Sequence, residues 1–211
     1  MLAKLKSSVY CMFTVLLFSA ILSTSGCNIT ETEGEPIVKP LESPYGEVIP
    51  TCEDLHCQLF YLKPEPYEHT IYRPDGAIVH SRMYESNDQQ VLLSMSICEY
   101  PDEELAVQCI HDERIGPFCD KADIENYARR FQFPLEDIAG HVIFWKEPSD
   151  DGAKGREKIL FRMGHHVGDY EVWLDSPPQL EDGYYIPLPF HDLLETAVDV
   201  TIPRLSSIQT P

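Results

Sequence analysis

Apolar and polar side chains alternate most clearly between residues 91 and 100. Large apolar residues occupy every second position from Val91 to Ile97, and Ser94 and Ser96 lie between them. A period of two is typical of a strand that buries one of its faces. Shorter runs predict further strands at residues 56–62, 68–72, 77–84, 141–146, 158–163 and 170–174. A Pro-Asp-Gly turn at residues 74–76 predicts that two of these strands form a hairpin.

Three segments show instead the spacing of an amphipathic helix. The first follows Pro101, because proline and the acidic residues after it suit the first turn of a helix. The second runs from Asp120, as its cap, to Phe131. The third covers residues 188–205, and we expect Pro203 to end or bend it. Strands in hairpins, interrupted by helices, predict an α+β fold: an antiparallel sheet with two or three packed helices, including a C-terminal one.

The first 26 residues have the pattern of an export signal. Lys4 and Lys6 precede an apolar run from Val9 to Leu22, and the small residues 23–26 follow it. A basic start, a short apolar centre and a small-residue exit are typical of a secretory signal peptide. The run is shorter than the roughly 20 apolar residues that a transmembrane helix needs.

The end of this segment resembles the lipobox of prokaryotic lipoproteins. Ser25, Gly26 and Cys27 fit that pattern, whereas Thr24 departs from it because the family usually has leucine there. The resemblance implies cleavage before Cys27 and attachment of a diacylglyceryl lipid, with acyl chains such as palmitate, to its thiol. Two alternatives stay open, namely a cleaved signal without lipid, which would give a secreted protein, and a retained anchor.

Residues 27–50 are rich in proline and glutamate and poor in apolar side chains. Such a composition favours an extended, disordered segment. We therefore expect a signal peptide at residues 1–26, a lipid-anchored tether at 27–50 and a single α+β domain at 51–211. An edge strand at residues 47–49 is the alternative to a fully disordered tether.

The charge of the chain narrows the classes of partner. Asp and Glu number 35 against 16 Lys and Arg, which gives a formal net charge of −19. Nucleic-acid phosphates require a basic surface, and so do anionic lipid headgroups, so the sequence argues against both as partners of the folded domain. The predicted partners are the membrane, through the lipid anchor, and a protein or small ligand that the sequence does not identify.

The export predicted from the N-terminal segment would bring the cysteines into an oxidising compartment. Disulfides are plausible there, and we expect two local ones, Cys52–Cys57 and Cys109–Cys119, with Cys98 as a free thiol. Connectivity cannot be deduced from sequence, so these pairings are hypotheses. Zinc is the competing use, but the chain has no Cys-x-x-Cys pair.

Histidines are the best candidates for metal ligands. His165 and His166 are adjacent at a predicted turn, with Asp169 three residues further on and His141 on a predicted neighbouring strand. Together they could supply two or three ligands. Adjacent strand residues point to opposite faces, however, so ordinary turn residues are the alternative interpretation. No metal or other cofactor is predicted.

No catalytic motif supports an enzyme. The chain has no phosphate-binding loop, dinucleotide fingerprint, His-Glu-x-x-His pair or Gly-x-Ser-x-Gly elbow. We therefore predict an extracytoplasmic, membrane-anchored lipoprotein with a non-enzymatic binding or envelope role, and assign no catalytic residue. The alternative is a secreted or anchored metal-dependent hydrolase that uses the region of His141, His165 and His166, so enzymatic activity stays open.

Overall fold

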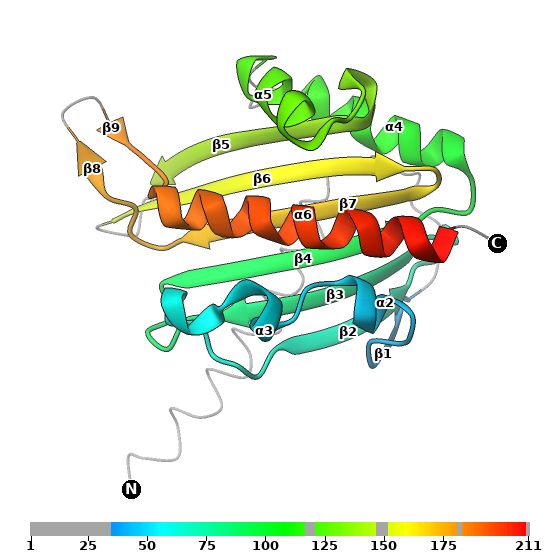
Figure 1. Ribbon diagram of the computed structural model, residues 1–211, viewed down its shortest axis with the longest axis horizontal. Coiled ribbons are helices and arrows are strands. Elements are labelled where there is room, and N and C mark those ends of the chain that lie inside the picture. Colours follow the sequence, from blue (N-terminus) through cyan, green and yellow to red (C-terminus); the bar gives the residue numbers. More distant parts are fainter. Residues whose placement is uncertain (1–34, 117–120, 147–151, 181–182, 210–211) are drawn as a thin grey trace, which may run out of the picture.

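A seven-stranded antiparallel sheet forms the centre of the computed structural model, which describes residues 35–116, 121–146, 152–180 and 183–209 (Figure 1). The strand order is β1-β2-β3-β4-β7-β6-β5. The strands are β1 (Ile37–Lys39), β2 (Tyr67–Tyr72), β3 (Ile78–Glu85), β4 (Val91–Glu99), β5 (Ile138–Lys146), β6 (Ala153–Met163) and β7 (His166–Leu174). Two meanders, β2–β3–β4 and β5–β6–β7, therefore meet where β4 pairs with β7. A small separate ribbon joins β8 (Gln179–Leu180) to β9 (Gly183–Tyr184).

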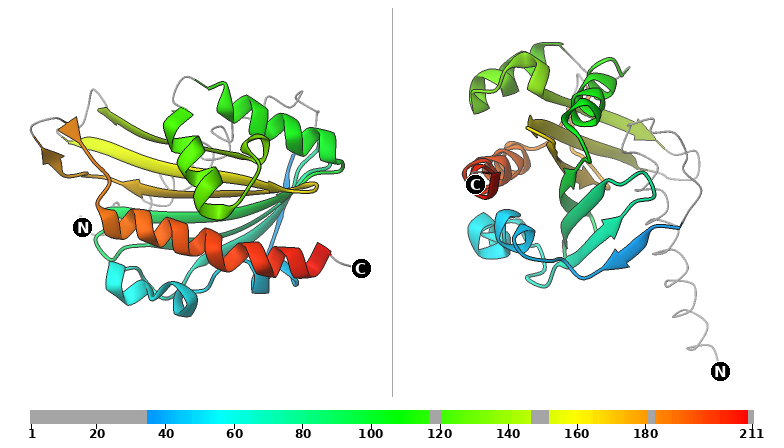
Figure 2. Two further views of the ribbon diagram at one scale, coloured as in Figure 1. Left: turned by 45° about the horizontal axis from the view of Figure 1, so that its top comes forward. Right: turned by 90° about the vertical axis from the view of Figure 1, so that its right-hand side faces the viewer.

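Helices cover one face of the sheet along its length and part of the other. They are α2 (Tyr45–Val48), α3 (Cys52–Leu55), α4 (Glu103–Arg114), α5 (Lys121–Phe131) and α6 (Leu188–Gln209), with 3-10 turns η1 (Cys57–Phe60) and η2 (Leu135–Asp137). Figure 1 shows α6 along β4 and β7, between α5 on one side and α2 and α3 on the other. In the right-hand view of Figure 2, α6 and the α2–α3 segment lie on the same side of the sheet. These elements confirm the predicted α+β fold with an antiparallel sheet and a C-terminal helix.

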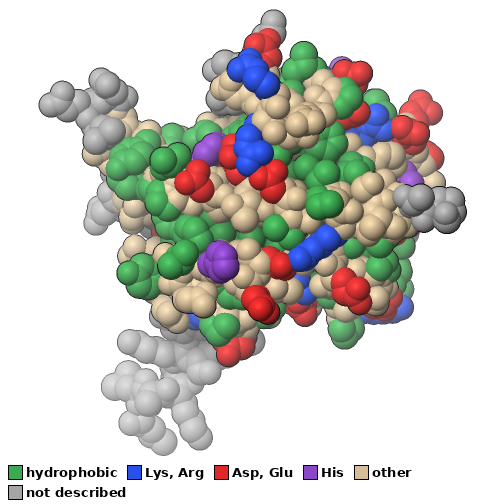
Figure 3. Space-filling model, viewed as in Figure 1, with side chains coloured by type: hydrophobic (Ala, Val, Ile, Leu, Met, Phe, Trp, Pro, Cys, Tyr) green, Lys and Arg blue, Asp and Glu red, His purple; other side chains and the backbone are tan. Residues whose placement is uncertain are grey.

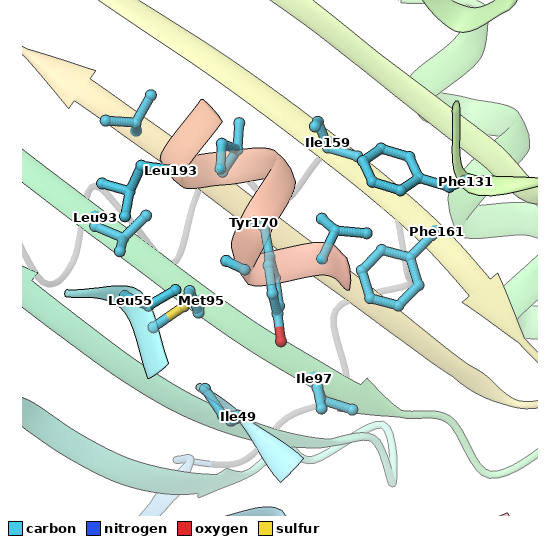
Figure 4. Packing of buried hydrophobic residues seen from close by; sticks show 14 of the residues in the cluster. Ile49, Leu55, Leu93, Met95, Ile97, Phe131, Ile159, Phe161, Tyr170 and Leu193 are labelled. Carbon is cyan, nitrogen blue, oxygen red and sulfur yellow. The ribbon is translucent and has the colours of Figure 1, made fainter. Parts of the chain in front are cut away.

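The main hydrophobic core lies between the sheet and α6. Tyr170 of β7 is fully buried at its centre, and its ring meets Phe161 of β6 edge-on, with centroids 5.6 Å apart (Figure 4). Gly168 is the cross-strand partner of Phe161, and a Cβ at this position would overlap the Phe161 ring. Close packing of this kind leaves no room for an extra methyl group, so glycine is required at Gly168.

A second, smaller core lies on the opposite face under α4. Ala106, Cys109 and Ile110 of α4 pack there against Leu160 of β6 and Val167 of β7. Leu160 and Val167 alternate along their strands with residues of the main core, as the period of two requires. The α4 helix thus covers only part of this face.

Polar side chains link α5 and α6 to the sheet. Glu157 of β6 is buried, and its Oε1 accepts a hydrogen bond from the Tyr127 hydroxyl (2.6 Å) and lies 2.5 Å from His191 Nδ1. On the surface above it, Arg130 of α5 pairs with Glu195 and Asp199 of α6. Figure 3 shows this face, where acidic, basic and apolar side chains are interspersed.

The strand predicted at residues 56–62 is wrong. A capping box between Thr51 and Asp54 begins α3, and the η1 turn follows it. His56 and Tyr61 at the two ends of this turn have positive φ angles of 51° and 57°, which reverse the chain direction. The local hydrogen bonds of the cap outweigh the strand propensity of the apolar residues, which still reach the core as Cys57 and Leu62.

Part of the segment predicted to be a tether belongs to the folded domain. Ile37–Lys39 pairs with β2, and Tyr45 and Val48 of α2 are buried. Arg82 of β3 holds this segment by donating hydrogen bonds to the carbonyl oxygens of Gly46 and Ile49. The domain therefore begins before residue 51, and the alternative edge strand at residues 47–49 does not form. Residues 27–34 lie outside the described part of the chain.

Pro203 does not end α6, which continues to Gln209. Pro203 lies on the exposed side of the helix, whereas Thr201 and Leu205 on either side of it are buried. The carbonyl group four residues before Pro203, which loses its N–H donor, can therefore be hydrated by solvent. Packing of the buried face keeps the segment helical on both sides of the proline. No helix in the described ranges is long and apolar enough to span a membrane.

Candidate ligand-binding site

A pocket of about 290 Å³ lies on the face of the sheet opposite α6. It extends over β2, β3, β4, β7 and β6, and Cys109 of α4 contributes to its wall. Most of its lining is apolar, including Ile71, Val79, Met83, Leu160 and Val167. The pocket exists because α4 covers only one end of this face, so the sheet surface beside the helix has no covering element among the described residues.

Polar groups lie among these apolar side chains. Ser81 and Ser96, on neighbouring strands, share a hydrogen bond of 2.7 Å between their hydroxyl oxygens. Lys158 is 2 % exposed, and its Nζ lies 3.1 Å from Asp169 Oδ2. The second oxygen of this carboxylate, Oδ1, is buried without a hydrogen-bond partner among the described residues. A mainly apolar pocket with a few fixed polar groups is the usual form of a small-molecule site.

Opposite charges keep the buried Lys158 ionised. Burial alone would lower the pKa of Lys158, but the carboxylates of Asp169, Glu171 and Glu113 outweigh burial and hold that pKa above its usual value. Burial and the nearby Asp169 carboxylate raise the pKa of Glu171, with Lys158 and Arg156 acting in the opposite direction. Lys158 is therefore a cation among several carboxylates, and Glu171 is the carboxylate that is easier to protonate.

The charged network continues beneath α4. Glu113 of α4 contacts His141 Nδ1 at 3.0 Å, and Lys158 Nζ lies 3.8 Å from its other oxygen. Arg156 is a donor, so the contact of 3.0 Å between its NH2 group and His141 Nε2 makes this nitrogen the acceptor and places the imidazole proton on Nδ1. Burial raises the pKa of Glu113, but the hydrogen bond from His141 and the charge of Lys158 outweigh it and lower that pKa.

Arg156 connects this network to two tryptophans. Its guanidinium lies 4.8 Å from the centre of the Trp173 ring and 3.5 Å from Glu171 Oε2. Trp145 of β5 meets Trp173 edge-on, with centroids 5.5 Å apart. The aromatic face and the carboxylate together offset the cost of burying the guanidinium.

The structure divides the predicted histidine cluster, bringing His165 and His166 together but leaving His141 and Asp169 on the other face of the sheet. His141 and Asp169 lie on the face that carries α4 and the pocket, where they contact Glu113 and Lys158. His166 lies on the opposite face, where its ring contacts Tyr45 and Gln209. His165, in the turn before β7, is partly exposed. The rings of His165 and His166 nevertheless lie only 4.1 Å apart between centroids, so the expected divergence of adjacent strand residues does not separate these two histidines.

The cysteines follow the predicted pattern as far as the structure describes them. Cys52 is bonded to Cys57, and Cys98 is a buried free thiol. Cys109 is disulfide-bonded, and its predicted partner Cys119 lies outside the described residues. The predicted lipid-attachment residue, Cys27, also lies outside them.

The sequence reasoning missed the buried charges of Arg156, Lys158 and Glu171, and considered Asp169 only as a candidate metal ligand. Arg156 and Lys158 are two positions apart on β6, and so are Asp169 and Glu171 on β7. This spacing places each like-charged pair on one strand face, and opposite charges on two strands are a signal for pairing. The register that joins Lys158 to Glu171 is visible only in the structure.

Comparison with protein-family models and with curated protein sequences found no match. Among solved structures, the chain is similar to the extracellular domain of PknH from Mycobacterium tuberculosis. The likeness has 10% sequence identity and a TM-score of 0.30, and covers 87% of this chain and 90% of that chain. At this score it supports no inference about function, which is therefore argued from the site alone.

Proposed function

We propose that this protein is a lipid-anchored extracytoplasmic domain that binds a small, partly apolar molecule in the pocket opposite α6. The observation that carries the proposal is the pocket of about 290 Å³, with its apolar wall and the buried pair of Lys158 and Asp169. Its volume lies at the lower end of the range for small-molecule sites. A ligand with an apolar body and one hydrogen-bonding group matches this lining.

The anchor is supported by the sequence before the domain. Residues 4–26 have the order of a signal peptide, and Ser25, Gly26 and Cys27 resemble a lipobox. The disulfide between Cys52 and Cys57 is consistent with an oxidising compartment. The proposed role is non-enzymatic binding, in keeping with the sequence-based prediction.

The intact mass of the protein purified from membranes tests the anchor. We expect a chain that begins at Cys27 and carries a diacylglyceryl group. A Cys27→Ala variant should lose the lipid and leave the membrane fraction. An unlipidated wild-type mass beginning near residue 27 would show instead that the protein is secreted.

A fluorescent probe tests the pocket. N-phenyl-1-naphthylamine is neutral, has an apolar body with one N–H donor, and becomes fluorescent when it leaves water. A chain that starts at residue 28 keeps every described residue, and we expect it to bind one probe molecule saturably. Val79→Trp fills the pocket and should weaken binding at least tenfold, whereas Val107→Trp, at an exposed position of α4, should leave binding unchanged. Equal binding by both variants would refute this pocket as the site.

A further inference from the structure

Side chains with metal-binding atoms converge at the end of the sheet where β4 stops and β7 begins. Glu99 is the last residue of β4 and pairs directly with His166, the first residue of β7. One ligand atom each from Glu99, His165 and His166 lies within 4.8 Å of the other two. This cluster lies on the α6 side of the sheet, so it is separate from the pocket and from its charged network.

The distances around Glu99 are close to those of a coordinated ion. His165 Nε2 lies 3.9 Å from Glu99 Oε1, and His80 Nε2 lies 3.9 Å from Glu99 Oε2. Zinc binds nitrogen and oxygen at about 2.0–2.1 Å in a tetrahedron, which separates neighbouring ligand atoms by about 3.4 Å. The contact between Glu99 and His165 therefore needs to shorten by about half an ångström, and ligand atoms that lie up to 4.8 Å apart need to approach by at most about 1.4 Å. His165 is in a turn and partly exposed, so its side chain can make this adjustment.

His80 has a free nitrogen that faces the same carboxylate. It is 4 % exposed, and its Nε2 has no hydrogen-bond partner in the part of the chain that the structure describes. Its Nδ1 lies 3.2 Å from Thr70 Oγ1, and Tyr45 stacks on its ring at 3.7 Å. A proton on Nδ1 donated to Thr70 would leave the lone pair of Nε2 directed at Glu99, which is the arrangement of a metal-binding histidine.

A chain of hydrogen bonds fixes Glu99. Gln209 Nε2 lies 2.8 Å from His166 Nδ1 and donates to the carbonyl oxygen of Met163. His166 Nε2 lies 2.7 Å from the Tyr45 hydroxyl, which donates to Glu99 Oε2 at 2.8 Å. For His166 to bind an ion through Nε2, its proton moves to Nδ1 and the Gln209 amide turns to accept it. Outer hydrogen bonds of this kind orient metal ligands and fix the tautomer of a histidine.

We propose that Glu99, His165 and His166 bind a first-row divalent transition-metal ion, next to His80, whose Nε2 faces the same carboxylate. Imidazole and carboxylate ligands suit zinc, copper and nickel ions. The formal net charge of −19 attracts cations to the protein.

Zinc titration of the full chain tests this site. The protein is purified in non-ionic detergent without an affinity tag, treated with a chelator and titrated with Zn²⁺ in a calorimeter. We expect one ion per chain and a dissociation constant in the micromolar range or below. His165→Ala should weaken binding at least tenfold and should fold normally, because His165 is half exposed.

His111→Ala is the matched control. His111 is an exposed histidine on α4, outside the cluster, so its loss should leave the titration unchanged. Cobalt gives a second readout, because Co²⁺ in a tetrahedral site absorbs visible light strongly, and His165→Ala should abolish that absorption. The proposal is overturned if the wild type binds no stoichiometric zinc, if His165→Ala binds as the wild type does, or if His111→Ala weakens binding equally.

Discussion

Lys158→Met should be one of the most destabilising single substitutions on the pocket face. The side chain is 2 % exposed, and its Nζ lies 3.1 Å from Asp169 Oδ2 and 3.8 Å from Glu113 Oε2. At an effective dielectric constant of about 20, the nearer contact alone amounts to about 5 kcal/mol of attraction. Methionine has a similar length, so the substitution removes the charge without creating a large cavity.

The expected loss follows from the carboxylates that remain. Breaking a buried ion pair typically costs about 3–5 kcal/mol, because the remaining charge stays buried without a partner. In a domain of this size, such a loss lowers Tm by roughly 6–20 °C. Urea unfolding followed by tryptophan fluorescence measures it directly, since Trp145 and Trp173 lie next to the network.

Lys154→Met provides the control on the same strand. Lys154 lies 3.5 Å from Asp175, but both side chains are solvent-accessible, so its loss should cost less than about 1 kcal/mol. The difference in the free energy of unfolding between Lys158→Met and wild type should also become smaller as the pH falls towards 4. Protonation then removes the negative charges of the carboxylates that have lost their lysine partner. A loss below about 1 kcal/mol at pH 7, or one equal to that of Lys154→Met, would refute the role given to this ion network.

Three further outcomes are expected. Gly168→Ala should destabilise the domain by about 1–3 kcal/mol in urea unfolding, because the new Cβ overlaps an aromatic ring of the next strand. Gly46→Ala, whose nearest neighbour would be 4.0 Å away, should change stability little. Burial lowers the pKa of His80 and of His166 to about 4 in the folded protein. In the unfolded chain these histidines have a pKa of about 6.5, so between pH 6.5 and 4 the unfolded state binds more protons than the folded state. Stability should therefore fall as the pH drops from 6.5 to 4, and less steeply in His80→Gln; an unchanged slope in Tm against pH would contradict this. Burial raises the pKa of the Cys98 thiol to about 12, so iodoacetamide should modify Cys98 only after unfolding; rapid labelling of the native protein would show that it is accessible.

Local periodicity was sufficient to predict most strands and the C-terminal helix. The alternation from Val91 to Ile97 corresponds to β4, and Leu93, Met95 and Ile97 of this strand are buried in the main core. The apolar stripe of residues 188–205 corresponds to α6. Both patterns involve residues that are close in the sequence and lie in one strand or one helix. They can therefore be recognised from a single sequence.

Contacts between distant residues explain what could not be predicted. Tyr45 is buried in a segment whose composition favours disorder, because its hydroxyl contacts Glu99 and His166, which are 54 and 121 positions away. The charged network of β6 and β7 depends likewise on the register of these two strands, which places Lys158 opposite Glu171. A charged residue in a strand is normally assigned to the solvent-exposed face. The burial of Lys158 can therefore be explained only once the structure shows its partners Asp169 and Glu113 next to it.

The position of α6 at the seam of the two meanders constrains when this protein can finish folding. The pairing of β4 with β7 is the only strand contact that joins the meanders within the described sheet, and the residues that cover it come after residue 187. A ribosome or a secretion channel delivers the chain from its N-terminus, so the two meanders emerge before the helix that covers their junction. The apolar side chains at the junction of β4 and β7 remain exposed to water until α6 packs on them. The final cooperative folding step therefore depends on this helix. During translation or translocation the sheet is therefore incompletely packed, and the main core is complete only after α6 has packed against it.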